Sequence, residues 1–127
     1  MILRINGMTR INVGILPKHL TNKHLLAEHR EIKRIPNCIK KGRFSLDGQP
    51  QQFTLGKGHV KFFYTRLNYL LDRYKDLHKE CLKRNFNVQD YSDAWNDVPL
   101  EFMGDYQPTK QDICLIEQRI NERNALQ

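Results

Sequence analysis

The sequence predicts an all-α fold: a compact single domain of three main helices joined by long irregular loops. Three stretches carry apolar residues at the i, i+3, i+4, i+7 spacing that collects them on one face of a helix. The stretches between them, residues 42–56 and 86–108, are rich in Gly, Pro, Asn, Asp and Gln, which favour turns over strands. At 127 residues the chain is long enough to form a hydrophobic core without a disulfide or a metal.

The first predicted helix covers residues 22–40. Its apolar stripe consists of Leu25, Ile32, Ile35 and Ile39. Either Thr21 or Asn22 can cap its N-terminus with a side-chain oxygen. Because Pro36 lies inside the pattern, we expect it to kink the helix or to end its regular part near Ile35.

The second predicted helix, residues 58–84, has the longest pattern, and Asn85 is placed to end it in a left-handed conformation. Its stripe consists of Val60, Phe63, Tyr64, Leu67, Leu70, Leu71, Tyr74, Leu77, Cys81 and Leu82. The third helix begins at Thr109, where Asp112 forms most of a capping box and Ile113, Ile116 and Ile120 supply the apolar stripe. The residues before the first helix are expected to thread between these three helices.

The charge balance indicates a partner that carries phosphates. Lys and Arg number 21 against 14 Asp and Glu, giving a net charge of +7 and a pI near 9.5; plain solubility is the alternative explanation. With 39% hydrophobic and 28% charged residues, the chain is not of a disordered class. Its apolar runs, such as Leu25-Leu26-Ala27, are too short to span a membrane or to form a secretory signal.

Cysteine and histidine spacing gives no sign of a metal site or another cofactor. Cys38, Cys81 and Cys114 form no C-x-x-C pair, which predicts reduced, mostly buried thiols in a cytosolic compartment. On a helix, His24 and His29 are about 140° apart and cannot share one ion. The other three histidines, His19, His59 and His78, are isolated and are expected to be surface or packed side chains.

The polar face of the first predicted helix carries the clearest chemistry. Lys23, Arg30 and Arg34 fall within about 40° of one another if the helix is continuous. His24 and Glu31, seven residues apart, lie along the edge of this basic face. Such a face can bind phosphates while the carboxylate points into whatever is bound; a merely solvated charged face is the alternative.

Five blocks in order carry a resemblance to a known family. They are MTRIN at 8–12, HLLAEHRE at 24–31 followed by Arg34, FTLGKGHVKFFY at 53–64, ECLKRNFN at 80–87 and PLEFMGDY at 99–106. Together they resemble the pyrimidine dimer DNA glycosylases, the phage-type endonuclease V enzymes of ultraviolet-damage repair. The likeness covers residues 8–123.

The resemblance implies a DNA N-glycosylase with abasic-site lyase activity and no cofactor. Such an enzyme removes a base of a cyclobutane pyrimidine dimer and then cuts the abasic site by β-elimination. The implied catalytic groups are the Thr9 α-amine, which forms an imine, and the Glu31 carboxylate. The implied DNA-binding residues are Arg10, Lys23, His24, Arg30, Arg34, Arg119 and Arg123. For the last two, Glu117 or Glu122 could instead offset the like-charged pair.

The implied partner is double-stranded DNA with damaged bases or abasic sites, bound by a monomer in the nucleoid of a bacterial or phage-infected cell. Residues 1–7 precede the likeness, so we expect Met8 to start the glycosylase domain, residues 8–127, and to be removed from Thr9. Within these 127 residues we expect no counterpart of the aromatic-rich tail known in the family. Two alternatives therefore stay open: a non-catalytic DNA-binding module of the same fold, and a glycosylase/lyase for another lesion.

Overall fold

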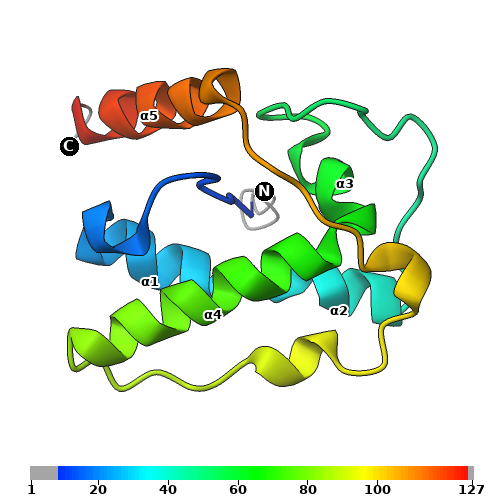
Figure 1. The fold of residues 1–127 in the computed structure, drawn as a ribbon, viewed down its shortest axis with the longest axis horizontal. Helices are drawn as coiled ribbons and strands as arrows, with labels where there is room; N and C mark the ends of the chain where they lie inside the picture. Colours follow the sequence, from blue (N-terminus) through cyan, green and yellow to red (C-terminus); the bar gives the residue numbers. More distant parts are fainter. Residues whose placement is uncertain (1–8, 126–127) are drawn as a thin grey trace, which may run out of the picture.

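The computed structural model describes residues 9–125, with the side chains of 9–122, and that part of the chain is helical without a β-strand (Figure 1). The α-helices are α1 (Asn22–Glu31), α2 (Arg34–Lys40), α3 (His59–Phe62), α4 (Leu67–Lys83) and α5 (Lys110–Ala125). Short 3-10 turns are η2 (Pro17–His19), η3 (Phe63–Thr65), η4 (Ser92–Trp95) and η5 (Leu100–Phe102). The all-α prediction is confirmed.

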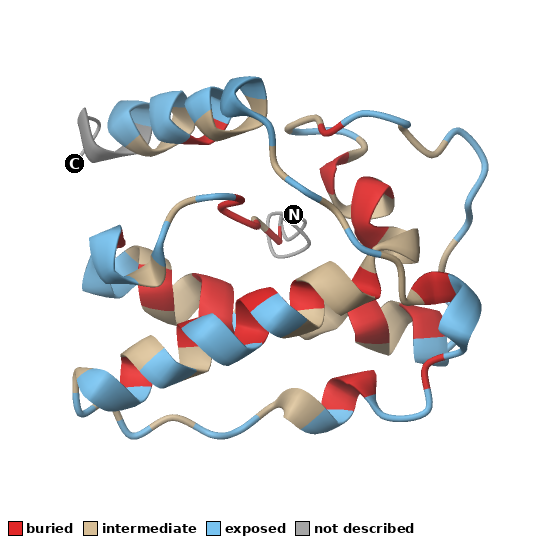
Figure 2. Cartoon of the chain, in the orientation of Figure 1, coloured by how far each residue is buried: buried red, intermediate tan, exposed pale blue. Residues whose placement is uncertain are grey.

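Residues 9–16, called the first segment below, run between α5 on one side and the pair of α1 and α4 on the other (Figure 1). Ile11 and Val13 are fully buried there. Buried residues also gather where α1, α2, α3 and α4 meet (Figure 2). The expectation that the start of the domain threads between the helices is therefore confirmed.

The first predicted helix is broken rather than kinked. α1 ends at Glu31 and α2 begins at Arg34, so the interruption comes before Pro36 and not at it. Pro36 is the third residue of α2, where the backbone N–H has no partner within the helix and its absence costs little. Ile32 and Ile35 both remain fully buried. The apolar pattern is thus correct for burial but wrong for continuity.

The second predicted helix is also broken, into α3, η3 and α4. Gly104 inserts at the break: its N–H donates to the Thr65 carbonyl at 3.1 Å, and its own carbonyl accepts from the Asn68 N–H at 3.1 Å. A Cβ at Gly104 would lie 2.3 Å from the Thr65 oxygen, so only glycine fits this close approach. A segment distant in sequence therefore takes the place of the helical hydrogen bonds.

The predicted helix ends are confirmed by their hydrogen bonds. Thr21 caps α1, since its Oγ1 accepts from the His24 N–H at 3.2 Å. Asn85 ends α4 with φ 65°, and its own N–H and that of Phe86 donate to the Leu82 and Cys81 carbonyls, both at 2.9 Å, in a Schellman motif. Thr109 and Asp112 form a reciprocal capping box at α5, each N–H donating to the other side chain at 3.1 Å.

The cysteines depart from expectation at two positions. All three are free thiols, but only Cys81 is buried; Cys38 is half-buried and Cys114 is exposed. Cys114 follows Ile113 in α5, and the helical rotation of about 100° turns it away from the stripe that packs inward. None of the described helices is both long and apolar enough to cross a lipid bilayer.

His59 is a packed histidine that holds the first segment in place. Its Nε2 accepts from the Ile11 N–H at 3.0 Å, and its Nδ1 donates to the Thr54 carbonyl at 2.9 Å. Burial lowers the pKa of His59 to about 4, since a charged ring would be desolvated. Burial likewise lowers the pKa of His29 to about 4, with a further contribution from nearby His78.

We expect acid to destabilise the fold below pH 6.5. Because the folded pKa of His59 lies near 4 and its unfolded value near 6.5, the unfolded chain binds more protons between these values. Stability is lost as pH falls through this window, by about 2 kcal/mol for His59 between pH 7 and pH 5. Urea denaturation at the two pH values measures this loss.

The His59→Gln variant isolates the contribution of this ring. A glutamine oxygen can still accept from the Ile11 N–H, but it does not titrate. The variant should lose about 2 kcal/mol less than the parent between pH 7 and pH 5. An equal loss in both proteins would contradict a neutral buried His59.

Candidate nucleic-acid interface and active site

A pocket of about 120 Å³ lies between α1, the first segment and α5. It is lined by Arg10, Asn12, Lys23, His24, Ala27, Glu28, Glu31, Arg119 and Ile120. Residues that are up to 110 positions apart in the sequence thus meet at one hollow. Five of the predicted site residues are among them: Arg10, Lys23, His24, Glu31 and Arg119.

Thr9 is not among the residues that line the pocket, but its neighbour Arg10 is. It directly precedes Arg10, whose Cα is therefore about 3.8 Å from that of Thr9. The Thr9 side chain is buried, with 5% of the residue exposed. In this chain its nitrogen belongs to the peptide bond that follows Met8, so it is an amide nitrogen and not an amine.

Glu31 combines partial exposure with neighbouring cations. Its side chain is 19% exposed, and Arg30 Nη2 lies 3.3 Å from its Oε2. Arg10, Lys23 and Arg119 line the same pocket, so three cations share it with the two carboxylates Glu28 and Glu31. An exposed ion pair such as that with Arg30 is weak. A bound molecule can therefore displace Arg30 and interact with the Glu31 carboxylate at little energetic cost.

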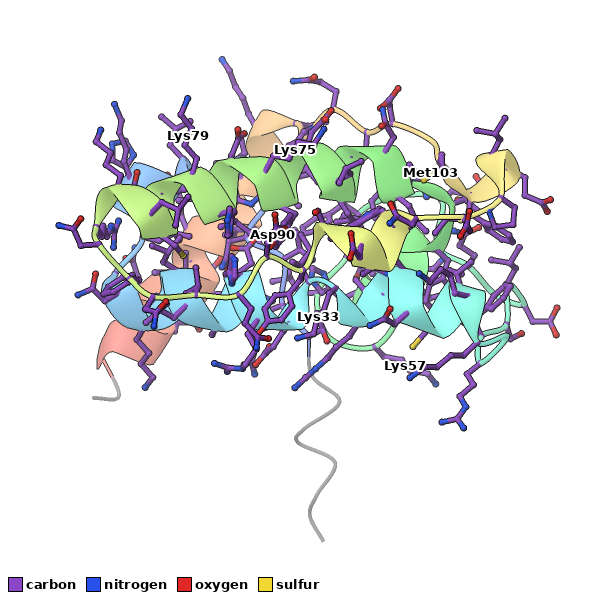
Figure 3. The ribbon with its side chains drawn as sticks, turned by 90° about the horizontal axis from the view of Figure 1, so that it is seen from below. Lys33, Lys57, Lys75, Lys79, Asp90 and Met103 are labelled. Carbon is purple, nitrogen blue, oxygen red and sulfur yellow. The ribbon has the colours of Figure 1, made fainter. Side chains whose placement is uncertain are left out.

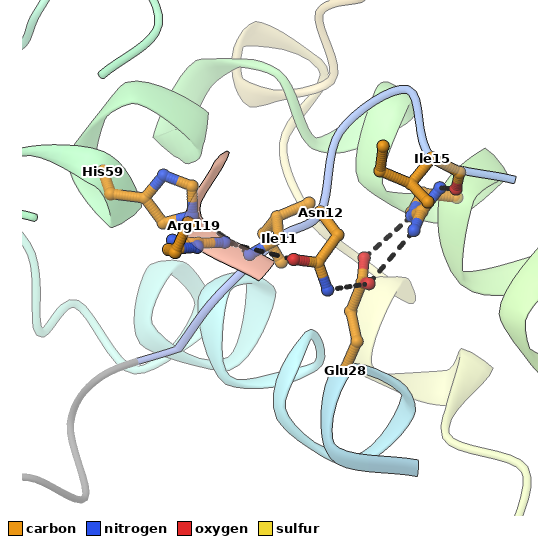
Figure 4. A network of polar contacts seen from close by, with 7 residues as sticks. Ile11, Asn12, Ile15, Glu28, His59 and Arg119 are labelled. Atoms are coloured by element: carbon orange, nitrogen blue, oxygen red, sulfur yellow. Dashed lines mark hydrogen bonds and ion pairs between the residues drawn. The ribbon is translucent and has the colours of Figure 1, made fainter. Parts of the chain in front are cut away.

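Glu28, the second carboxylate, is held by a buried ion pair with Arg73 of α4. The Arg73 Nε donates to Glu28 Oε2 at 2.7 Å and its Nη2 donates to Oε1 at 3.0 Å (Figure 4). The two side chains are only 1% and 7% exposed. Burial by itself would lower the pKa of Arg73, but the charge and the hydrogen bonds of Glu28, with smaller contributions from Tyr69 and Asp76, together outweigh it and raise that pKa.

The Glu28–Arg73 ion pair was not predicted from the sequence, although the apolar spacing around both residues indicates it. Glu28 follows Leu25 by three residues and precedes Ile32 by four, which places it within the apolar stripe. Arg73 stands in the same relation to Leu70 and Leu77. Opposite charges at core positions of two helices indicate a buried pair, because an unpaired buried charge is strongly disfavoured.

Asn12, also missed, connects this ion pair to α5. Its Nδ2 donates to Glu28 Oε1 at 2.8 Å, and its Oδ1 accepts from Arg119 Nη2 at 3.2 Å (Figure 4). Arg119 of α5 therefore contacts Asn12 of the first segment. The result is a polar network that runs from α4 through α1 and the first segment to α5.

Two predicted phosphate-binding arginines lie outside the pocket lining. The Arg30 side chain is 56% exposed and turns outward beside Glu31. Arg34 is the first residue of α2, beyond the break that follows α1, and does not line this pocket. The side chain of Arg123 lies outside the described residues.

The side of α1 that carries His29 does not line the pocket but packs against α4. His29 is buried, with its Nε2 3.0 Å from His78 Nδ1. The loop after α4, which carries Asp90, covers this seam between α1 and α4, and Lys33 lies beside it, 3.8 Å above the Tyr91 ring (Figure 3). Among the described residues, no three His, Cys, Asp or Glu side chains are arranged to hold a metal ion.

The family model described as pyrimidine dimer DNA glycosylase matches residues 8–93, about two thirds of the chain. The matched residues include Thr9, Arg10, the whole of α1 and Arg73, whereas α5 with Arg119 follows them. The match begins at the Met8 that opens the first of the resembling blocks. The resemblance is thereby confirmed, and the chain belongs to the pyrimidine dimer DNA glycosylase family, whose members are DNA repair glycosylases.

Proposed function

We propose that this protein removes one base of an ultraviolet-induced cyclobutane pyrimidine dimer in double-stranded DNA and then cuts the backbone by β-elimination. The observation that carries the proposal is the pocket in which Glu31 lies among Arg10, Lys23 and Arg119, since Arg10 directly follows Thr9 in the chain. A carboxylate surrounded by cations suits a site that binds a phosphate backbone and stabilises a developing positive charge.

The proposed nucleophile is the α-amine of Thr9. An α-amine has an ordinary pKa of about 7.7–8.0, against about 10.4 for lysine, so more of it is neutral and nucleophilic at pH 7. The amine attacks the sugar C1′ while the C1′–N bond breaks and the base leaves with the bonding electrons and a proton. The sugar ring opens to an imine, which acidifies the C2′ hydrogen. Loss of that proton then breaks the C3′–O bond and releases the phosphate.

Glu31 is proposed to assist at two points of this sequence. Its carboxylate stabilises the positive charge that develops on the sugar as the base leaves. It then accepts or relays the C2′ proton during β-elimination. His24, seven residues before it in α1, lines the same pocket and is proposed to contact the bound sugar and phosphate.

Around the pocket, positively charged side chains are proposed to bind the phosphates. Arg10, Lys23 and Arg119 line the pocket itself, while Arg30 and Arg34 lie outside it on α1 and α2. Arg123 is included from the resemblance. Each neutralised phosphate releases condensed counterions, so binding should weaken steeply with salt.

This mechanism requires the Thr9 nitrogen to be a free amine. An amide nitrogen cannot form an imine, because its lone pair is delocalised into the carbonyl. We therefore propose that the active form begins at Thr9, either because translation starts at Met8 and Met8 is then removed, or because proteolysis removes residues 1–8. Thr is small enough to follow a cleaved methionine, and the family match starts at this Met8.

The catalytic proposal is tested with the Glu31→Gln variant of protein that begins at Thr9, compared with parent protein that also begins at Thr9. Loss of the carboxylate should lower cleavage of an abasic-site duplex about 100-fold or more, while binding of the same duplex should stay within about twofold. Glu101→Gln, which alters an exposed carboxylate on η5, is the matched control and should cut like the parent. Parent-level cutting by Glu31→Gln would contradict the role of Glu31, and binding without cutting by the parent would indicate a non-catalytic module.

The start of the chain provides a separate prediction. A protein whose mass shows Thr9 as its first residue should cut an abasic-site duplex, whereas protein that retains residues 1–8 should not cut above background. The two should bind the duplex through the same basic residues. Equal cutting by the unprocessed chain, with its mass verified after the reaction, would refute the Thr9 amine as nucleophile.

A further inference from the structure

α5 is attached to the rest of the molecule by way of the first segment. Ile113 packs against Gly14, where an added Cβ would lie 2.3 Å from the Ile113 Cγ1, so no larger residue fits between them. One turn further along α5, Ile116 is fully buried. One more turn along, Arg119 reaches Asn12. The position of the Arg119 guanidinium therefore depends on how the first segment is held.

Asn12 is suited to the position between Glu28 and Arg119 because its amide has a hydrogen-bond donor on one side and an acceptor on the other. On one side it donates to the Glu28 carboxylate, which can only accept, and on the other it accepts from the Arg119 guanidinium, which can only donate. An aspartate here would place a second carboxylate against Glu28, and a leucine would make neither bond. Among uncharged side chains of this length, the amide of asparagine satisfies both neighbours.

The direction of the Asn12 amide is fixed by the ion pair behind it. Two hydrogen bonds from Arg73 hold the Glu28 carboxylate in one orientation, and Arg73 also donates to the Ile15 carbonyl of the first segment (Figure 4). A reversed amide would turn its oxygen toward a carboxylate and its NH2 toward a guanidinium. Both contacts would be repulsive, so the Asn12 oxygen must face Arg119.

We propose that Asn12 is a positioning residue that holds the Arg119 guanidinium at the pocket, where it binds a DNA phosphate. The polar network thereby transmits the fixed position of the Glu28–Arg73 pair to a DNA-binding side chain of α5. This inference rests on the proposed function, since it assigns Asn12 to the same DNA site. It adds to that site a residue that acts through Arg119 and not on the substrate.

A double-mutant cycle on the full chain tests the inference. The variants are Asn12→Ala, Arg119→Ala and the double variant, and the ligand is a duplex with a tetrahydrofuran abasic analogue that the lyase reaction cannot cut. Each single substitution should weaken binding about tenfold, and the double variant should bind no more than about twofold more weakly than Arg119→Ala alone. All three should reduce the slope of log affinity against log salt by about one phosphate contact.

Two controls separate positioning from folding. Asn12→Leu keeps the branched shape of the side chain but makes neither hydrogen bond, so it takes the place of Asn12→Ala in the cycle if the alanine variant does not fold. Asn68→Ala removes another asparagine hydrogen bond, to Asp105, and should bind like the parent. Thermal unfolding of each variant shows whether it is folded under the binding conditions.

Multiplicative losses in the double variant, or parent-like binding by a folded Asn12 variant, would overturn the inference. Because the analogue cannot be cut, these outcomes do not depend on catalysis. Cutting of a natural abasic-site duplex by protein that begins at Thr9 reports separately on the proposed function. If protein that begins at Thr9 bound the duplex without cutting it, the catalytic proposal would be refuted, while the binding energies of the cycle could still be interpreted.

Discussion

The buried ion pair between Glu28 and Arg73 is the interaction on which the arrangement of this molecule depends. It joins α1 to α4 through two hydrogen bonds, and the same two residues also hold the first segment through Asn12 and the Ile15 carbonyl. Removing one partner would leave a charge buried without compensation, which typically costs about 3–5 kcal/mol. The pair thus fixes three elements relative to one another at the point where the pocket forms.

This arrangement divides two carboxylates of one helix between two tasks. Glu28 and Glu31 are three residues apart on α1, and both line the pocket. The Glu28 carboxylate accepts two hydrogen bonds from Arg73 and therefore has a structural role. Glu31 meets only the exposed Arg30 in a described ion pair and stays accessible from the pocket. In our proposal this difference in environment makes Glu31 the residue that acts on the sugar, beside the Thr9 amine.

The features that could be predicted from sequence are those set by local interactions. The Thr109–Asp112 box and the left-handed Asn85 depend on neighbours within a few residues, and both are found as expected. An interruption of the first predicted helix was expected near Ile35 but lies between Glu31 and Arg34, and the break in the second was not expected. The second break depends on Gly104, almost forty residues beyond it, and apolar periodicity continues through it unchanged.

In the site, too, some residues could be identified from the sequence and others only from contacts between distant parts of the chain. The resemblance marked Arg10, Lys23, His24, Glu31 and Arg119, and the fold brings these five to one pocket. It did not mark Asn12, Glu28 or Arg73, whose contacts join positions 16 to 107 residues apart. Only charged residues within two apolar stripes signalled the buried pair, and nothing local to Asn12 could reveal that it lies between Glu28 and Arg119.

The central claim is that the Thr9 amine forms a covalent imine with DNA, and borohydride trapping tests it most directly. Protein that begins at Thr9 would be incubated with a duplex containing one thymine dimer or one abasic site, reduced with borohydride, and digested for mass mapping. The account predicts a reduced adduct on the Thr9 nitrogen with both duplexes. An adduct with the abasic duplex alone would contradict the dimer specificity, and no adduct with either would contradict the imine mechanism.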